Sequence, residues 1–173
     1  MSDKPQATVL VVDDSVESLA ILNDLLRPLY RVLAATSGEA GLRVARASPP
    51  PDLILLDVMM PGMDGYEVLT RLRAGADTAD IPVIFLTALG SAEDEGRGLE
   101  MGAADYITKP ISPAVLRARV RAQLEAKVAR DWLRDQNHTL DIEVARRMAE
   151  NDLTQQVSIR ALAHLAEMRD PET

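Results

Sequence analysis

The sequence predicts an α/β domain with a parallel sheet between two layers of helices, followed by one long helix. Two observations carry this prediction. Five short apolar runs alternate with segments of helical spacing, which favours right-handed crossovers and a parallel sheet. In addition, all nine glycines and nine of the ten prolines precede residue 114, so the remaining segment holds almost no helix breaker.

The first three elements follow from β-branched runs and one capping residue. Thr8–Val12 reads TVLVV, a short apolar run typical of a buried strand. Ser15–Leu26 predicts a helix in which Ser15 serves as N-cap and three leucines recur at helical spacing. Tyr30–Ala35 predicts the second strand. Because these strands are continuously apolar rather than alternating, we expect both faces of the sheet to be covered.

The middle of the chain continues the alternation with clear stop signals. Ser37 opens a predicted helix over Glu39–Ala47. Three prolines, Pro49–Pro51, end that helix before the strand Leu53–Leu56. The next expected elements are a helix at Tyr66–Arg73, a strand at Pro82–Leu86, a helix at Ala92–Met101 that ends at Gly102, and a strand at Asp105–Thr108.

The segment from Ser112 to about Met168 predicts a helix that first packs on the sheet and then pairs with another helix. Apolar side chains recur every fourth residue, a spacing that drifts around a helix: Leu116, Val120, Leu124, Val128 and Trp132. The next positions follow a 4-3-4 spacing typical of a coiled coil, with one polar position that would fix register: Leu133, Asn137, Leu140 and Val144. We expect a homodimer through this helix; the alternative is a single solvated helix. Phe85 and Trp132 are predicted to be packing residues.

Composition excludes several classes of protein. The chain has 173 residues, no cysteine and a net charge of −8. The excess of acidic residues lies before residue 114, and no basic surface is indicated, so we expect no direct contact with nucleic acid. No apolar run approaches 18 residues, and no leader opens the chain. We therefore expect a cytoplasmic protein without membrane insertion.

Acidic and polar residues follow the predicted strands where they end. Asp13 and Asp14 close the first strand, Asp57 closes the third and Thr87 closes the fourth. Lys109 follows the fifth strand directly. Because ligands of doubly wound sheets bind beyond the carboxyl ends of the strands, we expect these side chains to share one cleft.

Three neighbouring carboxylates repel one another unless a cation joins them. Mg²⁺ prefers such oxygen ligands and commonly lies beside phosphate. With the metal bound, Asp57 is placed to attack phosphorus and to carry an acyl phosphate, held rigidly by the end of a buried strand. Lys109 would then neutralise charge on the phosphoryl oxygens.

Four motifs give the chain a family resemblance. VLVVDDS at 9–15, LILLDVMMPGMDGYE at 53–67, PVIFLTA at 82–88 and GAADYITKPIS at 102–112 resemble the receiver domain of two-component response regulators. The resemblance covers about residues 7–125. It implies a flavodoxin-like fold with strand order 2-1-3-4-5.

By position, the resemblance implies a role for each residue of the cleft. Asp57 would be the phosphoacceptor, Lys109 its ion-pair partner, and Thr87 the hydroxyl that turns toward the phosphoryl group. Tyr106 would be the aromatic residue whose rotamer changes with the switch. The implied ligands of Mg²⁺ are Asp14, Asp57, Asp13 largely through water, and the backbone carbonyl of Met59.

The resemblance also implies finer features. The Lys109–Pro110 peptide would be cis, and the small Ala88 would leave room for the phosphodonor. Met59 and Leu89 occupy two positions that tune hydrolysis in such domains, and both are bulky and apolar. Slow loss of the phosphoryl group is therefore expected.

The last third of the chain resembles a different protein segment. Residues 133–173 are similar to the linker and first residues that precede an HD-GYP-type cyclic-di-GMP phosphodiesterase domain. Neither His138 nor His164 is followed by Asp, so the metal signature of that enzyme is absent. We expect a receiver domain at 1–125 and a helical linker at 126–173. We expect a fragment of a longer regulator; the alternative is a stand-alone protein that kept the linker.

The expected function is a phosphorylation-dependent switch, not an enzyme. A histidine kinase or phosphotransfer protein would supply the phosphoryl group, and the last helix would pass the change to an output domain or partner. Two alternatives remain open. One is a Mg²⁺-dependent phosphatase or phosphotransferase, and the other is a dimerisation module that works without phosphorylation.

Overall fold

The computed structural model describes residues 6–88 and 92–168. Contacts divide the chain into two units, Met1–Val128 and Ala129–Thr173. The first unit holds the sheet, and the described residues of the second, up to Met168, are all helical.

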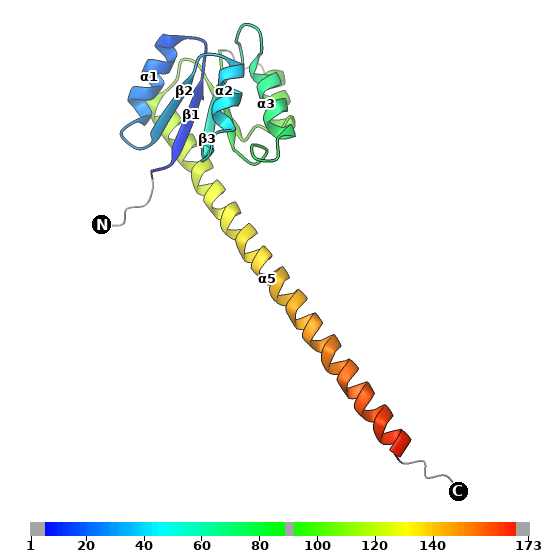
Figure 1. Ribbon diagram of the computed structural model, residues 1–173. Coiled ribbons are helices and arrows are strands. Elements are labelled where there is room, and N and C mark those ends of the chain that lie inside the picture. Colours follow the sequence, from blue (N-terminus) through cyan, green and yellow to red (C-terminus); the bar gives the residue numbers. More distant parts are fainter. Residues whose placement is uncertain (1–5, 89–91, 169–173) are drawn as a thin grey trace. The chain divides into compact units, whose positions relative to one another are not determined.

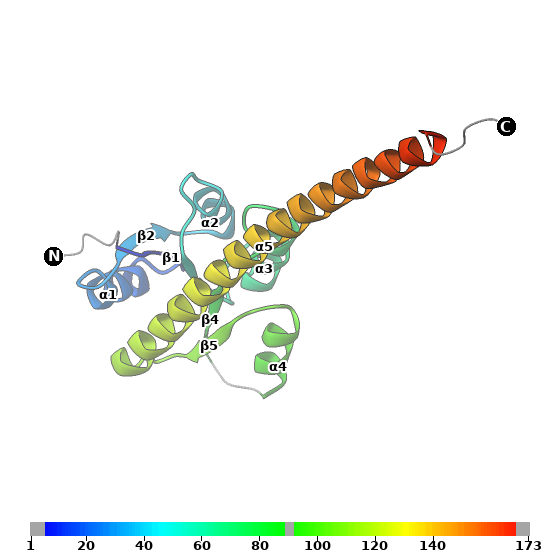
Figure 2. The same cartoon turned by 90° about the horizontal axis from the view of Figure 1, so that it is seen from below.

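The first unit contains one five-stranded parallel sheet in the order β2-β1-β3-β4-β5. Figures 1 and 2 show the strands with their helices. The strands are β1 (Thr8–Val12), β2 (Arg31–Ala35), β3 (Leu53–Asp57), β4 (Val83–Thr87) and β5 (Asp105–Thr108). The helices are α1 (Val16–Leu26), α2 (Gly38–Ala45), α3 (Gly65–Ala74), α4 (Ala92–Glu100) and α5 (Pro113–Met168), the last of which continues into the second unit. The predicted flavodoxin-like fold and strand order are confirmed.

Helices cover both faces of the sheet, as the continuously apolar strands predicted. On one face, α1 and the first turns of α5 pack against side chains such as Val9, Leu55 and Ile84. On the other face, α2 and α3 pack against side chains such as Leu10 and Leu56. Because successive side chains of a strand point to opposite faces of the sheet, each strand contributes to two hydrophobic cores, one on either face.

Three helices begin at a polar residue that accepts a backbone hydrogen bond. The side chains of Ser15, Ser37 and Asp64 accept the N–H groups of Ser18, Ala40 and Glu67, respectively. Each bond satisfies one of the donors that the first turn of a helix leaves without a partner. Ser15 as N-cap and the helix opened by Ser37 are both confirmed.

The observed elements differ from the predicted ones at their ends. The apolar runs stop at Leu56 and Leu86, but β3 and β4 each extend one residue further, to Asp57 and Thr87. The ladder continues because Asp57 lies opposite Leu86 and Thr87 lies opposite Thr108. The polar residues thus belong to the rigid ends of the strands rather than to the loops that follow.

Helix α5 changes its environment along its length. Leu116, Val120 and Leu124 are buried on the sheet, whereas Val128, one turn later, is exposed. In the second unit, the large apolar side chains are exposed as well. Trp132 is 60% exposed, so its prediction as a packing residue is wrong for the single chain.

Among the helices of residues 6–88 and 92–168, none has the length and apolar character that a membrane span requires.

Candidate functional site

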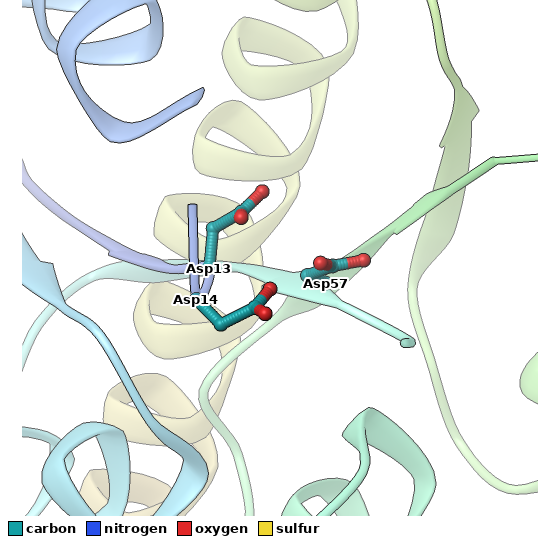
Figure 3. A group of neighbouring side chains, drawn as sticks. All are labelled: Asp13, Asp14 and Asp57. Atoms are coloured by element: carbon teal, nitrogen blue, oxygen red, sulfur yellow. The ribbon is translucent and has the colours of Figure 1, made fainter. Parts of the chain in front are cut away.

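Three carboxylates meet at one edge of the sheet. Asp13 and Asp14 directly follow β1, and Asp57 is the last residue of the neighbouring strand β3. Because β1 and β3 are parallel and adjacent, their carboxyl ends lie side by side (Figure 3). One carboxylate oxygen from each residue lies within 4.8 Å of the others. The structure thus brings together the three carboxylates that chain order predicted to lie close to one another.

Asp13 is buried, and both of its oxygens have protein partners. Oδ1 accepts the backbone N–H of Ser15 at 2.8 Å, and Oδ2 lies 3.0 Å from the ammonium nitrogen of Lys109. Asp14, in contrast, is exposed to solvent. Asp13 therefore holds Lys109 and the turn into α1 in place, whereas the carboxylate of Asp14 faces solvent.

Asp57 is held in place from two sides. Its Oδ1 accepts the backbone N–H of Met59 at 3.2 Å, and its Oδ2 lies 3.5 Å from the ammonium nitrogen of Lys109. The side chain is almost fully buried. The Lys109 ammonium, which follows β5, thus bridges two carboxylates that come from two different strands.

Burial raises the pKa of Asp57 above its ordinary value, because a low-dielectric environment disfavours the charged form. The positive charge of Lys109 opposes this shift, and the negative charge of Asp13 adds to it. The hydrogen bond from the N–H of Met59 lowers the pKa, as Lys109 does, but the pKa of Asp57 remains above its ordinary value. Without a further cation, the ionised form of Asp57 is therefore disfavoured by its surroundings.

The pKa of Lys109 is also raised. Burial alone would lower it, but the hydrogen bond to Asp13 and the negative charges of Asp57 and Asp13 together outweigh burial. Lys109 therefore remains an ammonium at neutral pH. One ammonium faces three carboxylates, so the cluster keeps an excess of negative charge when all three are ionised.

The cluster fits a hard divalent cation. Carboxylate oxygens are the ligands that Mg²⁺ prefers, and a second positive charge would offset the burial that raises the pKa of Asp57. Asp14 and Asp57 each offer an oxygen within the 4.8 Å cluster. Both oxygens of Asp13 already accept hydrogen bonds from the protein, which suits a ligand that acts through water.

The remaining predicted residues lie on β4 and β5 or in the segments that follow β3 and β4. Thr87 ends β4, and Tyr106 lies on β5; both line one small cavity beneath α4. The Lys109–Pro110 peptide is cis, as the resemblance implied. Ala88 is exposed, and Met59 is 73% exposed. Leu89 lies outside the described residues.

Sequence reasoning missed one residue that shapes the site, Gly65. It begins α3, and its N–H donates to the carbonyl of Val58 at 2.9 Å. A Cβ atom here would lie 2.5 Å from the carbonyl oxygen of Asp57 and 2.8 Å from Cα of Val58. Only glycine therefore lets α3 approach the end of β3 so closely. The signal was the DG pair inside the motif that followed Asp57.

Comparisons with known proteins agree with this geometry. Residues 9–121 match the response regulator receiver domain family. A putative response regulator from Chloroflexus aurantiacus, known from its crystal structure, is 38% identical with a TM-score of 0.66, covering 70% of this chain and 99% of that one. Response regulator PleD from Caulobacter vibrioides is 45% identical over 129 residues, which are 74% of this chain and 28% of PleD.

A third relative matches the whole chain. It is a probable cyclic di-GMP phosphodiesterase from Vibrio cholerae, 46% identical over 173 residues, which are 39% of that protein. The chain thus spans less than two fifths of the length of the Vibrio relative and less than a third of the length of PleD. The family match over residues 9–121, the strand order of the sheet and the carboxylate cluster at its edge all point to the same family. The chain belongs to the response regulator receiver domain family.

Proposed function

We propose that this chain is a phosphorylation-controlled switch in which Asp57 accepts a phosphoryl group from a histidine kinase or a phosphotransfer protein. The observation that carries the proposal is the meeting of Asp13, Asp14, Asp57 and Lys109 at the carboxyl end of the sheet. Membership of the receiver family supports the same role.

The chemistry is a displacement at phosphorus. A carboxylate oxygen of Asp57 attacks the phosphorus of a phosphohistidine, the new P–O bond forms, and the P–N bond breaks with its electron pair left on the imidazole. Lys109 already lies 3.5 Å from Asp57 and is placed to pair with a phosphoryl oxygen. Asp14, Asp57 and the carbonyl of Met59 would hold Mg²⁺, with Asp13 acting through water. When bound, the ion neutralises charge on the phosphoryl oxygens.

Thr87 and Tyr106 would convert the added charge into a change of conformation. They line the same cavity, so a movement of the Thr87 hydroxyl toward Asp57 changes the room that the Tyr106 ring can use. A shift from mostly inactive to mostly active needs about 5.5 kcal/mol of differential stabilisation. Charge-assisted hydrogen bonds from Thr87 and Lys109 to the phosphoryl group provide a large part of it.

Residues 126–173 would be a linker that carries the change onward. Leu133, Leu140 and Val144 form the apolar part of the 4-3-4 seam, and all three are exposed in the single chain. Asn137 occupies the polar seam position, which favours a parallel pair in fixed register. We infer a homodimer through this helix and, from the name of the Vibrio relative, an output domain that acts on cyclic di-GMP.

The enzymatic alternative is not favoured by the site. A phosphatase that uses an aspartyl nucleophile would normally carry a second acid two residues later, and that position is occupied by the exposed, apolar Met59. No other acidic residue of the described chain joins the cluster of Asp13, Asp14 and Asp57. This chain therefore accepts a phosphoryl group rather than turning over a phosphoester.

Mass spectrometry of the intact chain and its peptides tests the phosphoryl transfer. After incubation with acetyl phosphate and Mg²⁺, the peptide that contains Asp57 should gain about 80 Da, the mass of one phosphoryl group. Asp57→Asn should lose the adduct, and Asp24→Asn, which removes an exposed carboxylate on α1, should retain it. An adduct that persists in Asp57→Asn, or none at all in the wild type, contradicts the proposal.

Light scattering tests the dimer and its coupling to the site. Beryllofluoride imitates the phosphoryl group, so its addition with Mg²⁺ should change the mass or shape of the wild-type chain. Leu140→Asp removes one seam contact and places a charge there, and it should leave a monomer in both conditions. A wild type that stays monomeric with and without the analogue contradicts the dimer.

A further inference from the structure

Helix α4, like α2, is short and glycine-rich. It spans nine residues and includes two glycines, Gly96 and Gly98. Each glycine weakens a helix relative to alanine because its backbone loses more conformational freedom on folding. A helix of this composition depends on outside contacts for its position, and two such contacts are visible.

The first contact is a close approach between the helix backbone and a buried ring. A Cβ atom at Gly98 would lie 2.9 Å from Cδ2 and 3.1 Å from Cε2 of Phe85. Phe85 lies on β4 and is almost fully buried, so the ring has little room to give way. At Gly96, by contrast, a Cβ atom would meet no described atom within 4 Å. Gly98 therefore lets α4 pack directly against the Phe85 ring. We call this contact between Gly98 and Phe85 the seat of α4, and Gly96 takes no part in it.

The second contact ties α4 to α3. The guanidinium carbon of Arg97 lies 4.5 Å from the ring centroid of Tyr66, a cation–π arrangement. Tyr66 in turn meets the Phe85 ring edge-on, with 5.3 Å between the ring centroids. Arg97, Tyr66 and Phe85 thus form one stack from the surface to the sheet.

This stack borders the cavity beneath α4. Phe85 and Gly98 form part of its wall, and Thr87 and Tyr106 form another part. From outside, the Arg119 guanidinium lies 5.6 Å from the Tyr106 ring and pairs with Asp105. A Tyr106 ring that turns inward would have to share this small space with the residues that seat α4.

We propose that the contact between Arg97 and Tyr66 is a latch that holds α4 on Phe85 and thereby stabilises the unphosphorylated conformation. The proposal rests on the phosphoryl switch proposed above. In the phosphorylated conformation, α4 leaves its seat on Phe85, and the cavity admits the Tyr106 ring. Arg97 acts as a positioning residue for α4 and has no part in the chemistry at Asp57.

Binding of beryllofluoride with Mg²⁺, measured by titration calorimetry, tests the latch. Because the analogue binds the active conformation, removing a contact made only in the inactive one raises its apparent affinity. Arg97→Gln should bind the analogue about two- to five-fold more tightly than wild type, the factor that corresponds to a solvent-exposed cation–π contact. Arg46→Gln removes the same charge from the exposed C-cap of α2 and should bind as wild type does. Unchanged affinity in Arg97→Gln overturns the latch.

A pair of glycine variants tests the seat independently. Gly98→Ala places a Cβ atom against Phe85 and should raise the affinity in the same direction as Arg97→Gln. Gly96→Ala only raises helix propensity, so its affinity should equal that of wild type or fall slightly below it. If both alanine variants bind alike, the seat on Phe85 does not control α4.

Hydrogen exchange separates failure of the latch from failure of the switch. In the protein without analogue, Arg97→Gln should raise the exchange rates of α4 amides and leave those of α1 unchanged. This readout needs no phosphoryl chemistry. If the wild type does not bind beryllofluoride, the phosphoryl switch fails, and unaltered α4 exchange in Arg97→Gln overturns the latch in either case.

Discussion

The two units of the chain use the same residue types in opposite ways. In the first unit, leucines and valines on strands and helices are buried in two cores, and Leu116 at the start of α5 is fully covered. In the second unit, the large apolar side chains from Trp132 to Leu165 are 54–67% exposed. One continuous helix therefore begins with satisfied apolar contacts and continues without them.

This difference assigns distinct roles to the two units. A helix gains most of its stability in proteins from packing an apolar face, and a helix without such packing is marginal in water. The pairs Arg147–Glu143 and Arg146–Glu150 add little, because exposed ion pairs contribute up to about 1 kcal/mol at most. The first unit has packed apolar cores of its own, whereas the second would gain such contacts only through the dimer proposed above.

The same substitution placed in each unit gives the largest contrast. Leu55→Ala removes a fully buried side chain of β3 and should lower the unfolding free energy by about 2–5 kcal/mol. Leu140→Ala removes an exposed side chain of the seam and should change the unfolding free energy of the first unit by less than about 0.5 kcal/mol. Chemical denaturation of the dilute chain measures both values. A large effect of Leu140→Ala on the first unit would mean that the two units fold together.

Gly65→Ala should have the next largest effect. The added methyl group would lie 2.5 Å from the carbonyl oxygen of Asp57, so α3 must move away from β3. Overpacking of this kind costs about 1–3 kcal/mol, and it should also slow phosphorylation because Asp57 loses its rigid support. Thermal unfolding and phosphorylation rates measure the two effects. Gly62→Ala is a poor control because Gly62 has a positive φ. At Gly96 an added Cβ atom meets no described atom within 4 Å, so Gly96→Ala should leave the phosphorylation rate unchanged and should keep or slightly raise the unfolding temperature through its higher helix propensity.

The fold could be predicted from sequence further than the site could. Apolar runs and capping serines located every strand and helix of the first unit, because hydrophobic period and local hydrogen bonding act within a few residues. Chain order also placed the carboxylates of Asp13, Asp14 and Asp57 together, since parallel strands end at the same edge of a sheet.

What sequence could not provide were contacts between distant residues that share no pattern. Gly65 against the Asp57 carbonyl and Gly98 against Phe85 depend on how closely two elements approach. The exposure of Trp132 likewise depends on where the helix stops touching the sheet. A spacing of four residues predicts that an apolar stripe drifts but does not say at which residue it loses its partner.

Met59→Asn should shorten the lifetime of the phosphorylated protein. The side chain of Met59 is exposed beside Asp57, and it offers no polar group to hold a water molecule near the phosphorus. An amide at this position should speed loss of the phosphoryl group on the order of 10-fold, which corresponds to about 1.4 kcal/mol in the barrier. Decay of phosphorylated protein, followed by mass spectrometry, measures the rate. Met59→Leu is the matched control and should decay at the wild-type rate.

Asp57→Asn should have the smallest effect on stability, and the sign of that effect is informative. Because burial raises the pKa of Asp57 in the folded state, ionisation of this residue lowers stability as pH rises through that pKa. Asp57→Asn has no such charge, so without metal it should be more stable than wild type at pH 7. The advantage should vanish at a pH below the pKa of unfolded Asp, where both proteins carry a neutral side chain. Lys109 contributes stability below its unfolded pKa and should therefore not obscure this window. Thermal unfolding at several pH values measures the difference.

Addition of Mg²⁺ should then stabilise the wild type more than Asp57→Asn, because binding to the folded state alone raises its stability and the variant lacks one ligand. Equal stabilisation of the two proteins by Mg²⁺ would remove Asp57 from the metal site, even if the carboxylate still accepted a phosphoryl group.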